Sequence, residues 1–354
     1  ARDWVSIWAW RVRWFKPLEK EEYRVELDPG GRVVGFDHRI LESDEGASLD
    51  QDAARDIASR FLRESQGFNL AEYELIEQST KERKARGDHT YSYRKRGFTV
   101  GDDGHYRLTV VVKGDQLGAF REGVKVPESF SRNYAEIRSR ADLLTSSFGV
   151  FWVALAVAAL VILLQFYRKG LLDWQPGLVI GGLVVIASIV GVINSLPLIL
   201  YSFNTTQSYA AFMAMMLAVM VLISVLQGGV IASVGTSGNA VGRQTLHGGL
   251  LSPLGRIRFG GILSRGFLRS TLVGYGIAGG MIGYITIFYL IGTRYFGLYA
   301  PADVSDYNNA FSTVLPWIYP LLAGLTAATL EEFLFRLLAI SLLVRWLKRP
   351  WLAV

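Results

Sequence analysis

Two adjacent carboxylates, Glu331 and Glu332, lie inside a long apolar stretch of the sequence, and Arg336 follows four residues after Glu332. On a helix, Glu332 and Arg336 occupy positions i and i+4 with the acid first, which is the favourable order for an ion pair. Glu331 lies about 100° further round the helix and has no such local partner. An unpaired carboxylate at membrane depth is a candidate proton relay, ion ligand or general base.

The cost of placing these charges in a membrane constrains their surroundings. At ~1.5 Å per residue, Glu331 lies about 21 Å along the helix from Arg345, which we expect to mark the inner interface. This places the carboxylates near the middle or in the inner half of a ~30 Å hydrocarbon layer. Three unpaired charges would cost roughly 8–10 kcal/mol there, so they must be paired, protonated or exposed to a watery cavity. The purely structural alternative is a buried Glu332–Arg336 pair beside a spectator Glu331.

The segment from Glu331 to Arg336 resembles the EExxxR first motif of the CAAX prenyl endopeptidase and bacteriocin-processing (CPBP) family of intramembrane proteases. The resemblance covers residues 313–349 well and the apolar segments from about 148 onward only loosely. It implies that Glu331 activates the hydrolytic water, while Glu332 and Arg336 form the pair that orients the site. From this resemblance alone, a divalent metal such as zinc is the implied cofactor. Peptides or proteins at the membrane are the implied substrates, and they include prenylated CAAX proteins.

The family's site also uses an FxxxH motif and a later HxxxN or HxxxD motif, and neither occurs after Arg336 in this sequence. The sequence begins without Met and stops within an apolar segment, so we expect a fragment of a longer enzyme that would be inactive by itself. A degenerate relative of the family is the alternative. A metal mechanism and a glutamate mechanism both remain open.

The charges divide the 354-residue chain into two parts, which must together position the motif. Residues 1–147 hold 25 Lys and Arg and 26 Asp and Glu, whereas residues 148–354 hold 12 and 5. The net charge of +6 therefore comes from a membrane half and does not indicate nucleic-acid binding. The absence of Cys excludes disulfides, thiolate catalysis and Cys-ligated zinc.

The second half contains five stretches that are long and apolar enough to cross a membrane, a crossing that takes about 20 helical residues. They lie near 148–167, 176–200, 209–235, 271–292 and 314–344. Ten of the twelve basic residues lie in segments on one side of these stretches, which the positive-inside rule makes cytoplasmic. We therefore expect a multi-pass protein of the bacterial inner membrane with residues 1–147 outside and lipids as its surroundings.

Residues 1–147 predict a small extracytoplasmic α+β domain. A hairpin is expected at 21–41, a helix at 50–66, and strands near 72–80, 89–96, 105–113 and 117–126. This order loosely resembles PepSY-type domains. His38, His89 and His105, and His247 in the second half, lack partners at metal-ligand spacing, so we interpret them as structural or solvated.

The predicted function is that of an intramembrane endopeptidase in which Glu331 activates water. The protease core would begin at about 313 within a transmembrane domain spanning 148–354. One alternative is a transporter coupled to protons or cations, with Glu331 as the ion ligand. Another is a membrane immunity or scaffold protein without catalysis.

Overall fold

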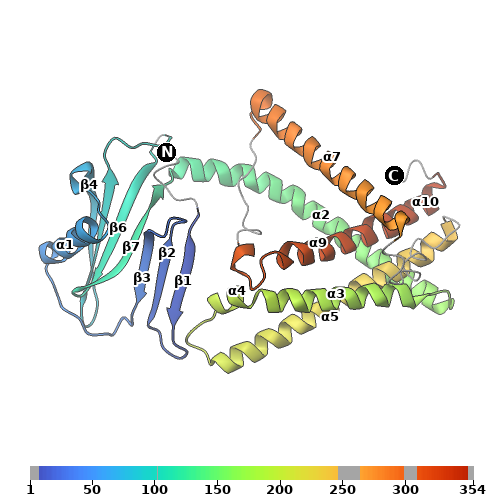
Figure 1. The fold of residues 1–354 in the computed structure, drawn as a ribbon, viewed down its shortest axis with the longest axis horizontal. Coiled ribbons are helices and arrows are strands. Elements are labelled where there is room, and N and C mark those ends of the chain that lie inside the picture. The colour runs from blue at the N-terminus through green and yellow to red at the C-terminus, as the bar shows by residue number, and fades with distance from the viewer. Residues whose placement is uncertain (1–7, 102, 246–263, 299–308, 350–354) are drawn as a thin grey trace. The chain divides into compact units, whose positions relative to one another are not determined.

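The computed structural model describes residues 8–101, 103–245, 264–298 and 309–349 (Figure 1). It divides into two compact units, and each of them takes in a second stretch of the chain. The first unit comprises Ala1–Ser146 and Phe203–Ala214, and the second comprises Ser147–Ser202 and Met215–Val354.

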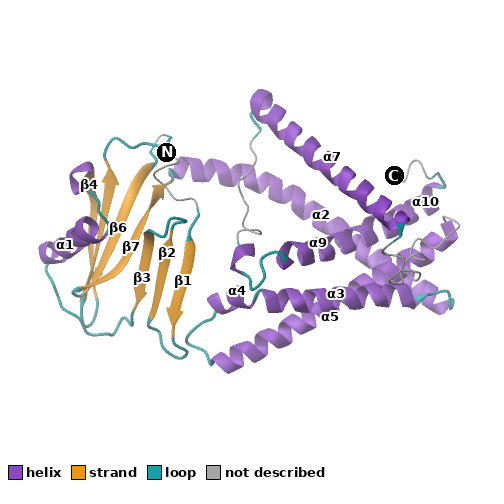
Figure 2. Ribbon diagram, in the orientation of Figure 1, coloured by secondary structure: helices purple, strands orange, loops and turns teal. Residues whose placement is uncertain are grey.

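The first unit is built on one antiparallel sheet of seven strands in the order β1-β2-β3-β7-β6-β5-β4 (Figure 2). The strands are β1 (Trp10–Phe15), β2 (Glu22–Leu27), β3 (Val33–Arg39), β4 (Tyr73–Glu82), β5 (Gly87–Lys95), β6 (His105–Lys113) and β7 (Gln116–Lys125). The predicted hairpin and the four later strands are confirmed. Strand β1 was not predicted from the sequence, although Trp10, Val12 and Trp14 alternate with arginines as a strand requires.

Helix α1 (Gln51–Arg60) continues into the π-helical η1 (Phe61–Ser65), which confirms the predicted helix at 50–66. The Asp50 side chain caps α1 by accepting a hydrogen bond from the amide of Ala53 at 2.7 Å. Ala54, Ala58 and Leu62 are fully buried against β5, β6 and β7. A short 3-10 helix, η2 (Leu70–Glu72), leads into β4. One packed face between helix and sheet is the expected core of an α+β unit.

Three tyrosines contribute their hydroxyl groups to this core. Burial raises the pKa of Tyr73 and of Tyr91 to about 12, and it also raises the pKa of Tyr106. The Tyr91 hydroxyl donates a hydrogen bond to the carbonyl oxygen of Gln51 at 2.6 Å, and the Tyr106 hydroxyl donates one to Glu122 at 3.1 Å. The neutral hydroxyl of Tyr91 therefore links β5 to the start of α1, and that of Tyr106 links β6 to β7.

The remaining elements are helical. They are α2 (Glu128–Arg168), α3 (Trp174–Asn194), α4 (Leu196–Tyr201), α5 (Tyr209–Thr245), α7 (Arg265–Phe296), the 3-10 helix η4 (Ala310–Ser312), α9 (Ile318–Glu331), the π-helical η5 (Glu332–Ile340) and α10 (Ser341–Leu347). Among the described residues, four helices are long and apolar enough to cross a membrane: α2, α3, α5 and α7. The fifth predicted stretch, 314–344, differs from them because the π-helical η5 separates two shorter α-helices.

The core of the second unit joins α2, α3, α5 and η5. Its buried side chains include Leu155, Ala159, Ile162, Phe166, Val184, Ile231, Val234, Val241, Phe333, Leu334, Leu337 and Leu338. Small residues bring α3 and α5 into backbone contact, because a Cβ added at Gly181 would lie only 2.5 Å from the carbonyl oxygen of Gly228. Close contact between helices through glycine is a common way to pack membrane helices.

Two polar contacts align the ends of these helices. Arg243, near the end of α5, forms an ion pair with Asp173, directly before α3. At the other end of α3, the Asn194 side chain accepts a hydrogen bond from the amide of Leu315 at 2.7 Å and donates one to its carbonyl oxygen at 3.2 Å. α3 therefore runs antiparallel to α5, and α9 begins beside the end of α3.

Candidate functional site

The predicted site residues lie at the junction of α9 and η5. Glu331 is the last residue of α9, Glu332 is the first residue of η5, and Arg336 lies in the middle of η5. π-Helical turns are rare, and they frequently occur at functional sites. The local backbone thus sets the motif apart from the regular helix that precedes it.

The structure contains the ion pair that the spacing predicts. Nη1 of Arg336 lies 3.0 Å from the Glu332 carboxylate. The side chain of Glu331 forms no hydrogen bond or ion pair with any residue that the structure describes. The two adjacent acids therefore differ, because one is neutralised by a cation and the other keeps a free carboxylate.

Among the described residues, protein atoms leave much of this ion pair uncovered. The side chains of Arg336 and Glu332 are 73% and 49% exposed, and Glu331 is exposed as well. The physical reason is the amphipathic pattern of η5, whose apolar residues Phe333, Leu334, Leu337 and Leu338 occupy the core. Packing this apolar face turns the charged face outward, so the motif lines the surface of the helical unit.

Close contacts with α5 fix the apolar face of η5. A Cβ added at Gly235 would lie 2.9 Å from ring carbons of Phe333, and one at Gly238 would lie 2.7 Å from Cγ of Leu337. On the side of α2, the ring of Phe335 meets that of Trp152 edge to face, with centroids 4.9 Å apart. Because α5 and α2 both constrain η5, the position of Glu331 depends on packing some distance from its carboxylate.

A set of polar side chains is buried among these helices and was not predicted from the sequence. Thr236, Ser237 and Asn239 of α5 and Ser341 of α10 are each no more than 1% exposed. The Ser237 hydroxyl lies 2.7 Å from the carbonyl oxygen of Ser233 and 3.1 Å from that of Ala159. Within the described ranges, the hydroxyls of Thr236 and Ser341 have no hydrogen-bond partner. The detectable signal was a run of polar residues, Thr236, Ser237 and Asn239, directly after the predicted span at 209–235.

The described histidines are held by local contacts in the sheet unit, as the structural interpretation expects. Nε2 of His38 lies 2.8 Å from Glu21, and His89 lies between the Thr80 hydroxyl at 3.0 Å and the Leu49 carbonyl oxygen at 3.1 Å. His105 lies 3.1 Å from the carbonyl oxygen of Asp103. His247 lies outside the described residues.

A zinc ion at Glu331 would need further ligands close to that carboxylate. Within residues 8–101, 103–245, 264–298 and 309–349, no three His, Asp or Glu side chains are grouped closely enough to hold a metal ion. The described residues therefore do not supply a zinc site around Glu331, and the cofactor stays a prediction from the family resemblance.

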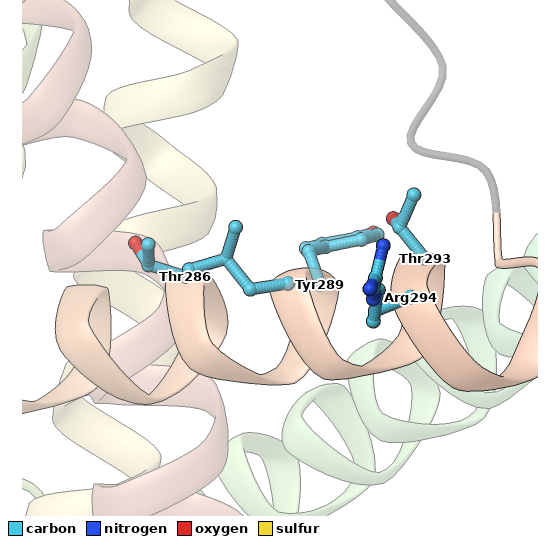
Figure 3. A pocket seen from close by; sticks show the side chains of 5 residues that line it. Thr286, Tyr289, Thr293 and Arg294 are labelled. Carbon is cyan, nitrogen blue, oxygen red and sulfur yellow. The ribbon is translucent and has the colours of Figure 1, made fainter.

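A hollow of about 540 Å³ lies along α7 and is lined by Thr286, Tyr289, Leu290, Thr293 and Arg294. Figure 3 shows that these side chains project from successive turns of one helix. A site for a small molecule normally encloses its ligand and brings polar groups together from several elements. The hollow is thus a groove on the helix surface, and the Glu331–Arg336 motif remains the stronger candidate.

Comparisons of the chain with protein-family models, with curated proteins and with solved structures found no match. The similarity to the CPBP motif therefore depends on the residues from Glu331 to Arg336 and on their helical setting.

Proposed function

We propose that this protein is a multi-pass membrane protein that carries the first part of a CPBP-type endopeptidase site, with Glu331 as the general base. Glu331 would accept a proton from water while the water oxygen attacks the carbonyl carbon of a peptide bond. Collapse of the tetrahedral intermediate would break the C–N bond, and the proton would leave with the amine. The Glu332–Arg336 pair would hold the helix turn and its charge in place.

The observation that carries this proposal is the difference between the two adjacent acids. Glu332 has its cation at 3.0 Å, whereas Glu331 has no partner among the described residues. A general base needs an available carboxylate that can reach water, and a neutralised neighbour keeps the total charge of the site low. The outward orientation of the motif leaves room for substrate and for the additional residues that a hydrolytic site requires.

Cleavage of a membrane peptide tests this proposal. The probe is a fluorogenic farnesylated peptide with a C-terminal CAAX sequence, incubated in ¹⁸O-water with the purified product of the complete gene in detergent. We expect a new carboxylate that carries one ¹⁸O atom, because hydrolysis adds solvent oxygen to the acyl carbon. A protein that cleaves neither this peptide nor a set of unprenylated membrane peptides would contradict the proposal.

A proton- or cation-coupled transporter is the second candidate, and the buried polar groups of α5 and α10 favour it. Hydroxyls such as those of Thr236 and Ser341, buried and without partners among the described residues, could coordinate an ion or a water chain. Proton uptake into liposomes containing the protein, measured with an internal pH dye, separates the two functions. Uptake that Glu331→Gln abolishes, without any peptide cleavage, would favour transport.

We also propose the bacterial inner membrane as the location, with the sheet unit outside the cytoplasm. The basic residues on one side of the spans support this orientation. The Asp173–Arg243 pair and the Asn194–Leu315 contacts join segments that the charge rule assigns to the same side. The chain has no native Cys, so single cysteines at Val100 and Arg258 test the orientation directly. In intact cells an impermeant reagent should label position 100 only, and labelling of position 258 would refute the orientation.

A further inference from the structure

The edge strand β1 has an aromatic face that the functional site does not explain. Trp10 and Trp14 lie on the same face of β1 and are 53% and 54% exposed. They pair across the strands with Leu27 and Tyr23, which extends the apolar surface onto β2. Helix α1 packs on β5, β6 and β7, at the other end of the sheet. Large exposed tryptophans on an edge strand usually indicate an interaction surface.

Strand β1 and the turn that follows it are hydrogen-bonded to the segment that leads into α5. Nη1 of Arg13 donates a hydrogen bond to the carbonyl oxygen of Phe203 at 2.7 Å, and the amide of Leu18 donates one to the carbonyl oxygen of Thr205 at 2.8 Å. Arg13 is held in turn by the buried Glu22, to which its Nε donates at 2.8 Å. Residues 203–214 accordingly belong to the same compact unit as the sheet.

Aromatic packing extends this attachment to the first turn of α5. Phe203 is 1% exposed, and its ring centroid lies 5.4 Å from that of Phe15 and 5.0 Å from that of Phe212. The α5 helix begins at Tyr209 and is apolar enough to cross a membrane. From Thr205 to Tyr209 the chain spans at most about 14 Å, so the end of β1 lies close to the start of this helix.

We propose that the β1 edge, with Trp10, Trp14 and Leu18, lies in the lipid headgroup layer at the membrane surface where α5 begins. The inference rests on the membrane placement of α5 that we proposed above. Tryptophan concentrates at this depth, because its ring is apolar and its N–H group can still reach water or headgroups. Leu18, which is 71% exposed in the turn after β1, adds an apolar side chain at the fastened end of the strand.

The bilayer is the occupant that the contacts favour for this surface. A soluble partner protein would have to bind the β1 edge directly beside the place where α5 enters the membrane. Lipid is already present at that place if α5 crosses the membrane, and the binding of β1 to it needs no second protein. The sheet unit would then be attached to the bilayer along an edge strand as well as through the helices that follow it.

Fluorescence quenching from single-cysteine variants tests the inference on the full chain. Trp14→Cys and Leu18→Cys are labelled with an environment-sensitive fluorophore and placed in nanodiscs of phosphatidylcholine and phosphatidylglycerol. Val219→Cys on α5, where the native side chain is 45% exposed, reports lipid contact, and Asp115→Cys in the exposed turn between β6 and β7 reports water. The quenchers are a lipid with a nitroxide near its headgroup, a lipid with a nitroxide on its acyl chain, and aqueous iodide.

We expect the headgroup nitroxide to quench the probes at 14 and 18 and the acyl-chain nitroxide to quench the probe at 219, while iodide quenches only the probe at 115. Quenching of 14 and 18 by iodide, with 219 still quenched by lipid, would overturn this inference and leave the membrane placement intact. Probes at 14 and 18 shielded from both quenchers would also overturn it, because protein would then cover the edge. Loss of lipid quenching at 219 would instead refute the membrane placement itself.

Discussion

The contact between α3 and α5 yields a sharp prediction, because two neighbouring glycines in α3 have different surroundings. A Cβ at Gly181 would lie 2.5 Å from the carbonyl oxygen of Gly228 and 2.9 Å from Cβ of Ala232. A Cβ at Gly182 would have no atom within 4 Å. Gly181→Ala should therefore force the two helices apart, whereas Gly182→Ala should fit without any movement.

The magnitude follows from the overlap. A carbon atom 2.5 Å from a backbone oxygen cannot be accommodated by a rotamer change, so the helix backbones themselves must shift. Overpacking of this kind costs about 1–3 kcal/mol. Both variants share the gain of about 0.5–1 kcal/mol from replacing glycine with alanine in a helix. Because this gain cancels between them, Gly181→Ala should be less stable than Gly182→Ala by about 1–3 kcal/mol.

Thermal unfolding of both variants in the same detergent measures this difference. The fraction of protein that remains monodisperse after heating gives the midpoint, and Gly182→Ala should match or slightly exceed the original protein. Equal midpoints for the two variants would refute the close approach of α3 to α5. The outcome also bears on the candidate site, since α5 carries the glycines that contact η5.

The remaining predictions concern other single contacts. Glu332→Gln should lower stability by only about 0.3–0.5 kcal/mol, as expected for an exposed i,i+4 pair. A far larger loss in the same unfolding assay would show that the pair is buried in the membrane. Asn194→Ala should cost about 1–3 kcal/mol, because the amide and carbonyl of Leu315 lose their partners, while Asn204→Ala in an exposed turn should cost less. The pKa values of Tyr73 and Tyr91 are raised in the folded protein, so the same tyrosines lose their protons at a lower pH in the unfolded chain. The free energy of unfolding should therefore stay constant below about pH 10 and fall as the pH rises toward 12. Near-ultraviolet circular dichroism as a function of pH measures this loss.

Much of the sheet unit was predictable, because its elements carry strong local signals. The helix at 50–66 has an Asp cap and a regular apolar face, and the hairpin at 21–41 has alternating residues around a Pro-Gly turn. The order of the strands was not predictable, since β3 pairs with the distant strand β7, with Gly35 opposite Arg121 and Phe36 opposite Phe120. Register between such distant strands depends on packing and turn geometry that a local pattern does not contain.

In the candidate site, too, local contacts were predictable from the sequence and long-range packing was not. The i,i+4 spacing predicted the Glu332–Arg336 pair, because an ion pair within one turn depends only on local geometry. The direction in which the pair points depends on which face of η5 packs against α5, and this follows from Gly235 and Gly238 meeting Phe333 and Leu337. The π-helical backbone from Glu332 to Ile340 likewise had no signal in the apolar sequence.

In the function that we propose, Glu331 acts chemically and Glu332 acts structurally. The most direct measurement compares Glu331→Gln and Glu332→Gln in the product of the complete gene, with cleavage rate and thermal midpoint determined on the same preparations. We predict that Glu331→Gln keeps the thermal midpoint and loses cleavage, because an amide cannot take a proton from water. Glu332→Gln should lower the midpoint slightly and retain part of the cleavage rate. A Glu331→Gln protein that cleaves at the original rate would contradict the assignment of the general base.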